Sequence, residues 1–330
     1  MKERSTIRPR TIESLTMDTS NKIDIIRLNT SSYQGEDFHQ REKEELESKF
    51  PVSYQSEVNP SRDHILITNS YSDIDSLDLN EKTKLIIHPN SGYDNFHLDI
   101  VQNSPCPIII GNEIRMNAVV NYTISCLLKH LNKLSSSKEW DSTRTWNRIL
   151  PENLKILVIG HGHIGEKVTS ILKSLGASPL IYDPYKGYTE LDNNGAQVVL
   201  VCASLNPKSK AFIDKSFLDA LDSSALIING ARGKIIDQNA LIDFLKLNKE
   251  SFAYLDVFEK EPYSRGEFSD LDNISPTSHI AGVHNSLNFD IIKFECKILE
   301  SYFSSPSRED FERENQAALL QNRIRENFLI

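Results

Sequence analysis

KILVIGHGHIG, residues Lys155–Gly165, joins an apolar run to a glycine-rich turn and then to a helix-like segment. Gly160 permits a tight turn out of the strand, Gly162 lets the backbone come close to a pyrophosphate, and Gly165 lets the following helix pack against the strand. This order of strand, turn and helix is typical of a dinucleotide-binding unit. The alternative interpretation is an ordinary strand–turn–helix unit whose glycines serve packing only.

The start of that helix offers free N–H groups and the positive end of its dipole to phosphates, so we expect His163 and Ile164 at the cofactor. Asp183 lies at the end of the next apolar run, 18 residues beyond Gly165. Its carboxylate can accept a hydrogen bond from a ribose hydroxyl, which predicts NAD as the cofactor. Because Pro184 follows it, Asp183 can also be interpreted as a turn residue.

Length and composition limit the classes of protein to consider. A chain of 330 residues is long enough for two domains. The formal net charge of −9 gives no electrostatic case for a nucleic acid or an anionic membrane as partner. The four cysteines have no CxxC spacing, so we expect buried thiols and no metal site. Without a membrane-length apolar run or a signal-peptide core, we expect a cytoplasmic protein.

Strand-like and helix-like segments alternate from Lys22 onward, which predicts an α/β fold with parallel sheets. Residues 1–21 are polar and without periodicity, so we expect a flexible tail, and residues 304–330 are polar, with partial order expected. The helical period of Ala118–His130 is long enough to link two lobes. The expected strands are 23–28, 52–54, 65–68, 84–88, 108–110, 156–159, 180–182, 198–202, 225–228, 252–257 and one near 275.

Three polar residues follow the carboxyl ends of predicted strands, where ligands bind in a doubly wound sheet: Arg232, Glu261 and His279. Hydride transfer between a nicotinamide and a C–OH carbon needs three groups. One takes or gives the hydroxyl proton, a cation binds the substrate carboxylate, and a third holds the pKa of the base near the working pH. Histidine, arginine and glutamate suit these tasks in that order. Taken singly, each residue also has a structural interpretation, as an ion-pair residue, a loop charge and a strand-end histidine.

Two loops after earlier strands are candidates for substrate binding. Ser70 follows one strand, and Ser91 and Gly92 follow another. Backbone N–H groups in a glycine-containing loop can bind a carboxylate. The alternative for both loops is a plain turn between a strand and a helix.

Around these residues the sequence resembles the D-isomer-specific 2-hydroxyacid dehydrogenase family. The resemblance covers roughly 84–303 and includes NGARGKIID at 229–237, LDVFEKEP at 255–262, TSHIAG at 277–282 and SGYDN at 91–95. It implies two lobes, with a Rossmann-type doubly wound cofactor domain (115–289) inserted in a smaller flavodoxin-like substrate domain (22–114 and 290–330). It also implies an active site in the cleft and a homodimer formed through the cofactor lobe.

The resemblance implies roles for the site residues. Arg232 would bind the carboxylate and carbonyl of a small D-2-hydroxy or 2-oxo acid, His279 would be the acid/base, and Glu261 would favour its protonated form. Asp256 would contact the nicotinamide amide. Two alanines would line the cofactor site: Ala203 and Ala231. The alternative is an NAD(H)-sensing interaction protein, because the C-terminal binding protein corepressors share this fold and these residues.

The segment between Asp183 and the next strand is short. A parallel crossover needs a dozen or more residues besides the strand it leads to, and only 14 residues, Pro184–Gln197, are available. We therefore predict that the third strand of the usual order is absent and that Leu180–Tyr182 is the sheet edge. The adenine pocket should then be open and dinucleotide binding weak.

Overall fold

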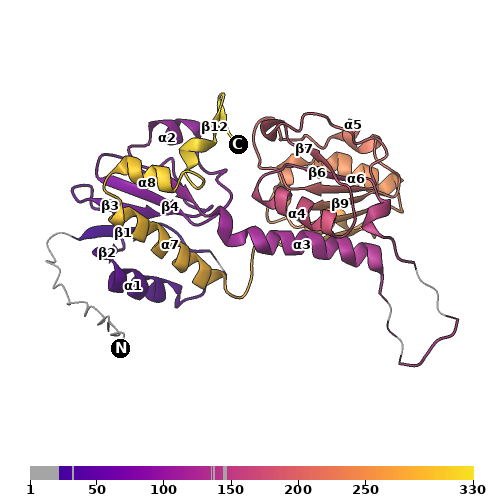
Figure 1. The fold of residues 1–330 in the computed structure, drawn as a ribbon, viewed down its shortest axis with the longest axis horizontal. Helices are drawn as coiled ribbons and strands as arrows, with labels where there is room; N and C mark the ends of the chain where they lie inside the picture. The colour runs from indigo at the N-terminus through magenta and orange to yellow at the C-terminus, as the bar shows by residue number, and fades with distance from the viewer. Residues whose placement is uncertain (1–21, 32, 135, 137, 144–146) are drawn as a thin grey trace, which may run out of the picture.

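The computed structural model describes residues 22–31, 33–134, 136, 138–143 and 147–330. The tail expected at 1–21 lies outside the described residues. The chain forms two lobes, each built on a parallel sheet, and the long helix α3 (Asn112–Asn132) leads from one lobe to the other (Figure 1). No helix of the described residues is long and apolar enough to cross a membrane.

The smaller lobe contains a five-stranded parallel sheet in the order β2-β1-β3-β4-β5, which is the flavodoxin-like order. Its strands are nearly continuous apolar runs because both faces of the sheet are covered, as is usual for parallel sheets. The strands are β1 (Ile23–Arg27), β2 (Val52–Gln55), β3 (His64–Ile67), β4 (Thr83–His88) and β5 (Ile108–Ile110).

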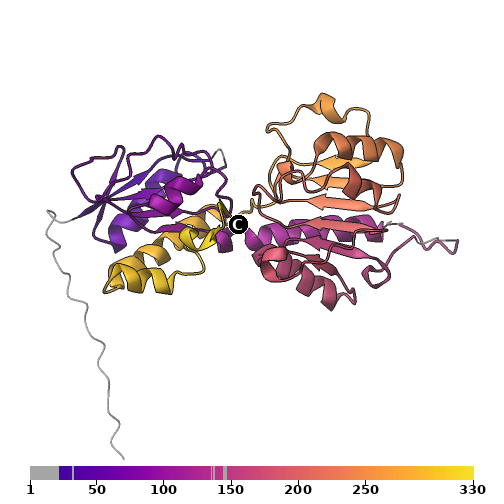
Figure 2. The same cartoon turned by 90° about the horizontal axis from the view of Figure 1, so that it is seen from above.

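Helix α7 completes this lobe after the chain has passed through the other one. Its buried residues Leu287, Ile291, Phe294 and Ile298 recur with helical spacing and pack against the sheet. Figure 2 shows this late segment of the chain beside the N-terminal half. The helices of the lobe are α1 (Phe38–Lys49), α2 (Leu98–Asn103), α7 (Leu287–Ser304) and α8 (Arg308–Glu314).

The larger lobe is of the Rossmann type and has the strand order β11-β10-β9-β8-β6-β7. Alternate residues of its strands face opposite helical layers, so that Leu157 and Val199 belong to one core while Val158 and Leu200 belong to the other. Its elements are β6 (Ile156–Ile159), α4 (His163–Ser174), β7 (Leu180–Tyr182), β8 (Val198–Val201), α5 (Lys215–Asp219), β9 (Leu226–Asn229), α6 (Gln238–Leu247), β10 (Phe252–Leu255) and β11 (Ile274–Pro276).

The prediction of a missing third strand is confirmed, because β7 is the edge of this sheet. After β7 the chain makes only the short turn η3 (Pro184–Lys186), and Asp183 and Tyr188 exchange backbone hydrogen bonds of 2.9 and 3.0 Å. Fourteen residues close this loop and return directly to β8.

The C-terminal segment is more ordered than the sequence predicted. After α8 it forms η6 (Leu320–Arg323) and a small hairpin of β12 (Ile324–Arg325) and β13 (Phe328–Leu329). Phe311, Leu320 and Phe328 are buried. The apolar residues of this segment fall in short runs, AALL at 317–320 and FLI at 328–330, which are too short to show a helix or strand period.

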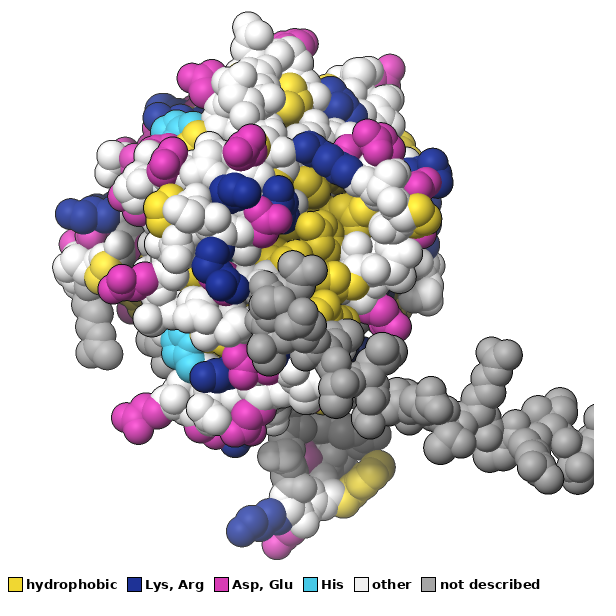
Figure 3. All heavy atoms as spheres, turned by 90° about the vertical axis from the view of Figure 1, so that its left-hand side faces the viewer, with side chains coloured by type: hydrophobic (Ala, Val, Ile, Leu, Met, Phe, Trp, Pro, Cys, Tyr) yellow, Lys and Arg dark blue, Asp and Glu magenta, His cyan; other side chains and the backbone are white. Residues whose placement is uncertain are grey.

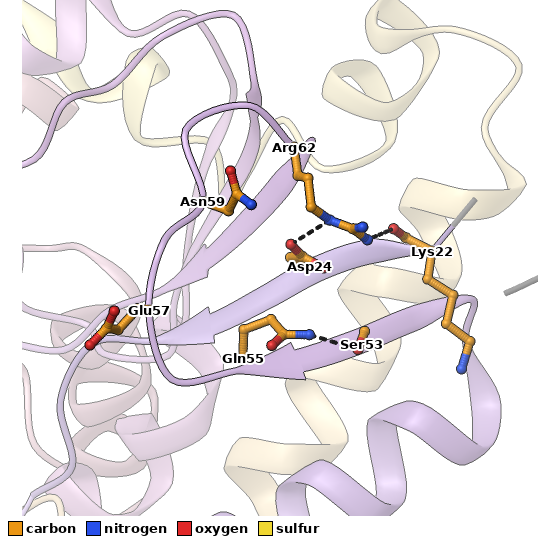
Figure 4. A pocket seen from close by; sticks show the side chains of 7 residues that line it. All are labelled: Lys22, Asp24, Ser53, Gln55, Glu57, Asn59 and Arg62. Atoms are coloured by element: carbon orange, nitrogen blue, oxygen red, sulfur yellow. Dashed lines mark hydrogen bonds and ion pairs between the residues drawn. The ribbon is translucent and has the colours of Figure 1, made fainter. Parts of the chain in front are cut away.

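Two hollows lie on the small lobe. One is lined by Lys49, Phe50, Cys296, Glu300, Phe303 and Ser304, and apolar side chains gather on one part of the outer face of this lobe (Figure 3). The other is polar (Figure 4). There Arg62 donates to the Asp24 carboxylate at 2.8 Å and to the Lys22 carbonyl at 3.1 Å, so the Arg62 and Asp24 charges form an ion pair.

A buried ion cluster joins the sheet of the small lobe to α1 and α7. Arg27 donates through Nε to both carboxylate oxygens of Glu42, at 2.7 and 2.8 Å, and also contacts Glu295. Burial raises the pKa of Glu295 well above its ordinary value, and the Glu42 carboxylate acts in the same direction. The protonated form of Glu295 is therefore favoured, and Glu42 is the anion that pairs with Arg27.

This assignment predicts unequal effects of two substitutions. Glu295→Gln preserves a neutral hydrogen-bonding group, so the free energy of unfolding at pH 7 should change by less than about 1 kcal/mol. Arg27→Met leaves the Glu42 charge unpaired and should cost about 3–5 kcal/mol. Urea unfolding of both variants checks this, and equal losses would contradict the neutral state of Glu295.

Candidate active site

The glycine-rich turn after β6 lies against the end of β8. Gly160 has φ of +89°, and a Cβ there would lie 2.5 Å from the Cα of Ala203, so only glycine fits. A Cβ at Gly165 would lie 2.0 Å from the Gly160 carbonyl oxygen. These contacts give the packing reason for the two glycines and place Ala203 directly beside the turn.

Gly162 has a different environment. A Cβ built there would meet nothing within 4 Å, so packing does not explain this glycine. It is the N-cap of α4, and the helix begins at His163 with its N–H groups free for an acceptor. Ile164 packs into the core behind the turn. Open space, free donors and the helix dipole together fit the pyrophosphate of a dinucleotide.

Asp183 shapes the same turn. Its carboxylate accepts hydrogen bonds from the backbone N–H of His161 at 2.7 Å and of Tyr185 at 3.1 Å. The rings of His161 and Tyr188 stack beside it, 4.9 Å apart. Asp183 therefore holds the loop after β6 against the loop after β7, and its half-exposed carboxylate lies where the adenosine ribose is expected.

His279 and Glu261 form a hydrogen-bonded pair. The distance from Nδ1 of His279 to Oε2 of Glu261 is 2.8 Å, and Glu261 also accepts from the Phe258 N–H at 3.0 Å. Burial alone would raise the pKa of Glu261, but these two hydrogen bonds and the charges of His279 and Arg232 bring it below its usual value. The partner of the histidine is thus an ionised carboxylate.

Asp256 anchors the loop that carries His279. Its carboxylate accepts from the Thr277 hydroxyl at 2.6 Å and from the N–H groups of Ile280 and Ala281 at 2.8 and 2.7 Å. Asp256 has no exposed surface. The observed role of Asp256 is to position the histidine loop, and the contact with the nicotinamide amide that we expected from the sequence stays a prediction.

Arg232 reaches from the end of β9 to the substrate loop of the small lobe. Its Nε is paired with Asp94, and its Nη1 donates to the Ala231 carbonyl at 2.7 Å. A Cβ at Gly92 would lie 1.4 Å from Nη2, so this glycine makes room for the guanidinium. The buried Asn229 fixes the loop by bonding to Ala231 N–H and to the Arg232 carbonyl, each at 3.0 Å.

The substrate loop is held by a residue that sequence reasoning missed. His88 is buried at the end of β4; its Nε2 lies 2.8 Å from the Gly92 carbonyl oxygen, and its Nδ1 lies 2.8 Å from the Thr68 hydroxyl. Burial lowers the pKa of His88 to about 4, so the ring is neutral and donates to Gly92. A histidine that ends an apolar strand just before the loop was the available signal.

Ser70 and Ser91, the other two residues expected at the substrate, lie on neighbouring loops. The Ser70 hydroxyl accepts from the Asn90 side chain at 2.8 Å, and the Ser91 hydroxyl lies 3.4 Å from the Asn112 carbonyl oxygen. The loops after β3 and β4 are thus tied together beside Gly92. Among the described residues, no group of three or more metal-ligating side chains is found.

The buried state of His88 predicts a pH dependence of stability. An unfolded histidine gains its proton near pH 6.5, whereas folded His88 does so only near pH 4. Stability should therefore fall as the pH decreases from 6.5 to 4, by about 3 kcal/mol for this group. His88→Gln should flatten that part of the curve in urea unfolding between pH 7 and 4; an unchanged slope would contradict the neutral buried state.

Comparison with known sequences and structures gives consistent results. A family model described as the NAD-binding domain of D-isomer specific 2-hydroxyacid dehydrogenases matches residues 124–281. D-3-phosphoglycerate dehydrogenase of Methanocaldococcus jannaschii is 27% identical over 224 residues, which are 62% of this chain but only 43% of that enzyme. A Staphylococcus aureus protein named as a 2-hydroxyacid dehydrogenase is 25% identical over 236 residues, 66% of this chain and 74% of that protein.

Solved structures with the same fold have lower sequence identity. D-lactate dehydrogenase from Aquifex aeolicus, complexed with NAD and lactic acid, aligns with a TM-score of 0.67 and 19% identity over 90% of this chain and 99% of that one. The NADPH-dependent glyoxylate/hydroxypyruvate reductase from Sinorhizobium meliloti has a TM-score of 0.69 and 17% identity over 86% of this chain and 95% of that one. The motifs, the matched domain and the shared fold agree: residues 124–281 match the NAD-binding domain of D-isomer specific 2-hydroxyacid dehydrogenases, and the chain shares the fold of the solved structures.

Proposed function

We propose that this protein is an NAD-dependent oxidoreductase that interconverts a small 2-oxo acid and the corresponding D-2-hydroxy acid. The observation that carries the proposal is the pairing of His279 with an ionised Glu261, at 2.8 Å, at the edge of the sheet where Arg232 reaches the substrate loop. The direct meeting of Arg232 and Gly92 favours a small acid.

The hydrogen bonds suggest how the residues share the work. When bound, the nicotinamide supplies the hydride for the carbonyl carbon. Since Nδ1 of His279 is engaged by Glu261, Nε2 is left to give its proton to the substrate oxygen as that oxygen gains charge. Among the described residues, Arg232 uses one donor on Asp94 and one on Ala231, which leaves three of its five N–H groups for the substrate carboxylate.

Further features of the proposal rest on the family resemblance. We infer a homodimer formed through the cofactor lobe, a cytoplasmic location, and domain limits at 22–114 with 290–330 and at 115–289. A panel of 2-oxo acids with NADH, followed by the loss of NADH absorbance, tests the activity. NADH binding without turnover of any acid would instead favour the sensing protein.

His279→Asn should lower kcat by about two to four orders of magnitude, the usual effect of losing a general acid–base group. His97→Asn is the matched control, because His97 is an exposed histidine paired with Asp75 away from the cleft, and its kcat should not change. In Glu261→Gln, the pKa seen in the pH–rate profile should be lower than in the wild type, because a neutral amide no longer favours the imidazolium form of His279. An unaltered profile in that variant would remove Glu261 from the mechanism.

The ribose contact proposed for Asp183 can be tested without disturbing the turn. Asp183→Asn keeps an acceptor for the His161 N–H but removes the charge that repels a 2′-phosphate. Wild-type protein should prefer NADH, and the ratio of kcat/KM for NADPH to that for NADH should rise in the variant. Equal use of both cofactors by the wild type would show that Asp183 does not select between them.

A further inference from the structure

The end of the chain is fastened to the edge of the small sheet before it reaches the cleft. Ile110 N–H donates to the Ala318 carbonyl at 2.9 Å, extending the ladder beyond β5. The Gln321 side chain bonds to the Ile108 N–H at 3.2 Å and to the Cys106 carbonyl at 3.0 Å. These bonds fix the position from which Arg323 and the hairpin β12–β13 project.

The hairpin presents its two faces to different lobes. Ile324 pairs with Leu329 across the hairpin, and both pack against the core of the small lobe. Arg325 pairs with Phe328, so Phe328 points to the opposite face. There its ring meets the ring of Tyr185 in the large lobe, edge to face, with centroids 6.1 Å apart. Both views show the chain end between the lobes (Figures 1 and 2).

Arg323 reaches the start of α4, where the pyrophosphate is expected. Its guanidinium lies 3.3 Å from Nε2 of His163, the first residue of that helix. In the part of the chain that the structure describes, Arg323 makes no salt bridge with a carboxylate. Burial, with the charges of Arg323 and Lys186, lowers the pKa of His163, while Glu166 acts against this.

Positive charge is thus concentrated at one point. The charges of Arg323 and Lys186 both act on His163, which opens α4 at the positive end of the helix dipole, and Glu166 is the one acidic residue in the first turn of that helix. Such an arrangement is unfavourable until an anion joins it. The planar fork of arginine suits phosphate oxygens better than a point charge does.

We propose that Arg323 is a ligand of the cofactor pyrophosphate that is contributed by the small lobe, and that Phe328 together with Tyr185 forms the adenosine-side wall which the missing third strand would otherwise supply. The cofactor site is then built by both lobes. Cofactor binding should consequently be stronger than the short segment after Asp183 predicts. The inference rests on NAD binding and does not depend on which acid is reduced.

Arg323→Gln tests the phosphate contact by calorimetric titration. A charge-assisted hydrogen bond contributes about 1.5–3 kcal/mol, so the Kd for NADH and for ADP-ribose should rise roughly 10- to 100-fold. The Kd for adenosine, which has no phosphate, should stay within about twofold. Arg325→Gln is the matched control, because the Arg325 guanidinium bonds only to the carbonyls of Asn322 and Ile324 among the described residues, and its Kd values should equal those of the wild type.

Phe328→Ser tests the wall. It should weaken the binding of adenosine, ADP-ribose and NADH by similar factors, since each of them carries the adenine base. Arg323→Gln should instead weaken only the two ligands that carry phosphate. Thermal unfolding of each variant shows whether the fold is retained, and removal of residues 324–330 tests the same wall in a second way. Tighter binding in either wall variant would mean that the hairpin blocks the site, and it would overturn the proposal.

Equal Kd values for NADH in Arg323→Gln and the wild type would overturn the phosphate contact. Because these are binding measurements, they decide the role of Arg323 even if no 2-oxo acid is turned over. Loss of turnover alone would instead count against the proposed reaction.

Discussion

The polarity of parallel strands is the constraint on which this molecule depends. In the large sheet, the register aligns Ile159 with Val201, Val201 with Asn229, and Asn229 with Leu255, so four strands end at one level. The loops that follow carry the glycine-rich turn, Ala203, Arg232 and the histidine anchor. No loop needs to be long to bring these groups together, because the ladder of backbone hydrogen bonds has already aligned their starting points.

One buried carboxylate then fixes the least regular part of the site. His279 has φ of +53°, a conformation that costs a residue with a side chain about 1 kcal/mol or more. The Asp256 carboxylate compensates by accepting three hydrogen bonds from the loop around it, and the Asp256 carbonyl accepts from the His279 N–H at 2.8 Å. A buried carboxylate is tolerated here because donors surround it. The imidazole is consequently held toward Glu261 by the loop as well as by its own hydrogen bond.

The sequence predicted those features that local patterns determine. Apolar runs marked the strands, the spacing of Gly160, Gly162 and Gly165 marked the cofactor turn, and a simple residue count predicted that β7 is an edge. What it missed depends on contacts between distant segments. The role of His88 depends on Thr68 and Gly92, and the hairpin at 324–329 is stable only because Ile324 and Leu329 find the core of the small lobe. A single apolar residue or a run of three in a polar segment carries no period that could reveal such contacts.

The contacts between the lobes determine which ligands can stabilise this arrangement of the two lobes. Arg232 of the large lobe meets Gly92 of the small one, and Phe328 of the small lobe meets Tyr185 of the large one. A ligand shifts an equilibrium between conformations only by the difference in its affinity for them. A substrate held by Arg232 and the loop at Gly92 has that difference, because both partners are present only when the lobes are together. The same reasoning applies to a dinucleotide held between Arg323 and the first turn of α4. Substrate and cofactor would then favour the same arrangement of the lobes, so the binding of either should assist the binding of the other.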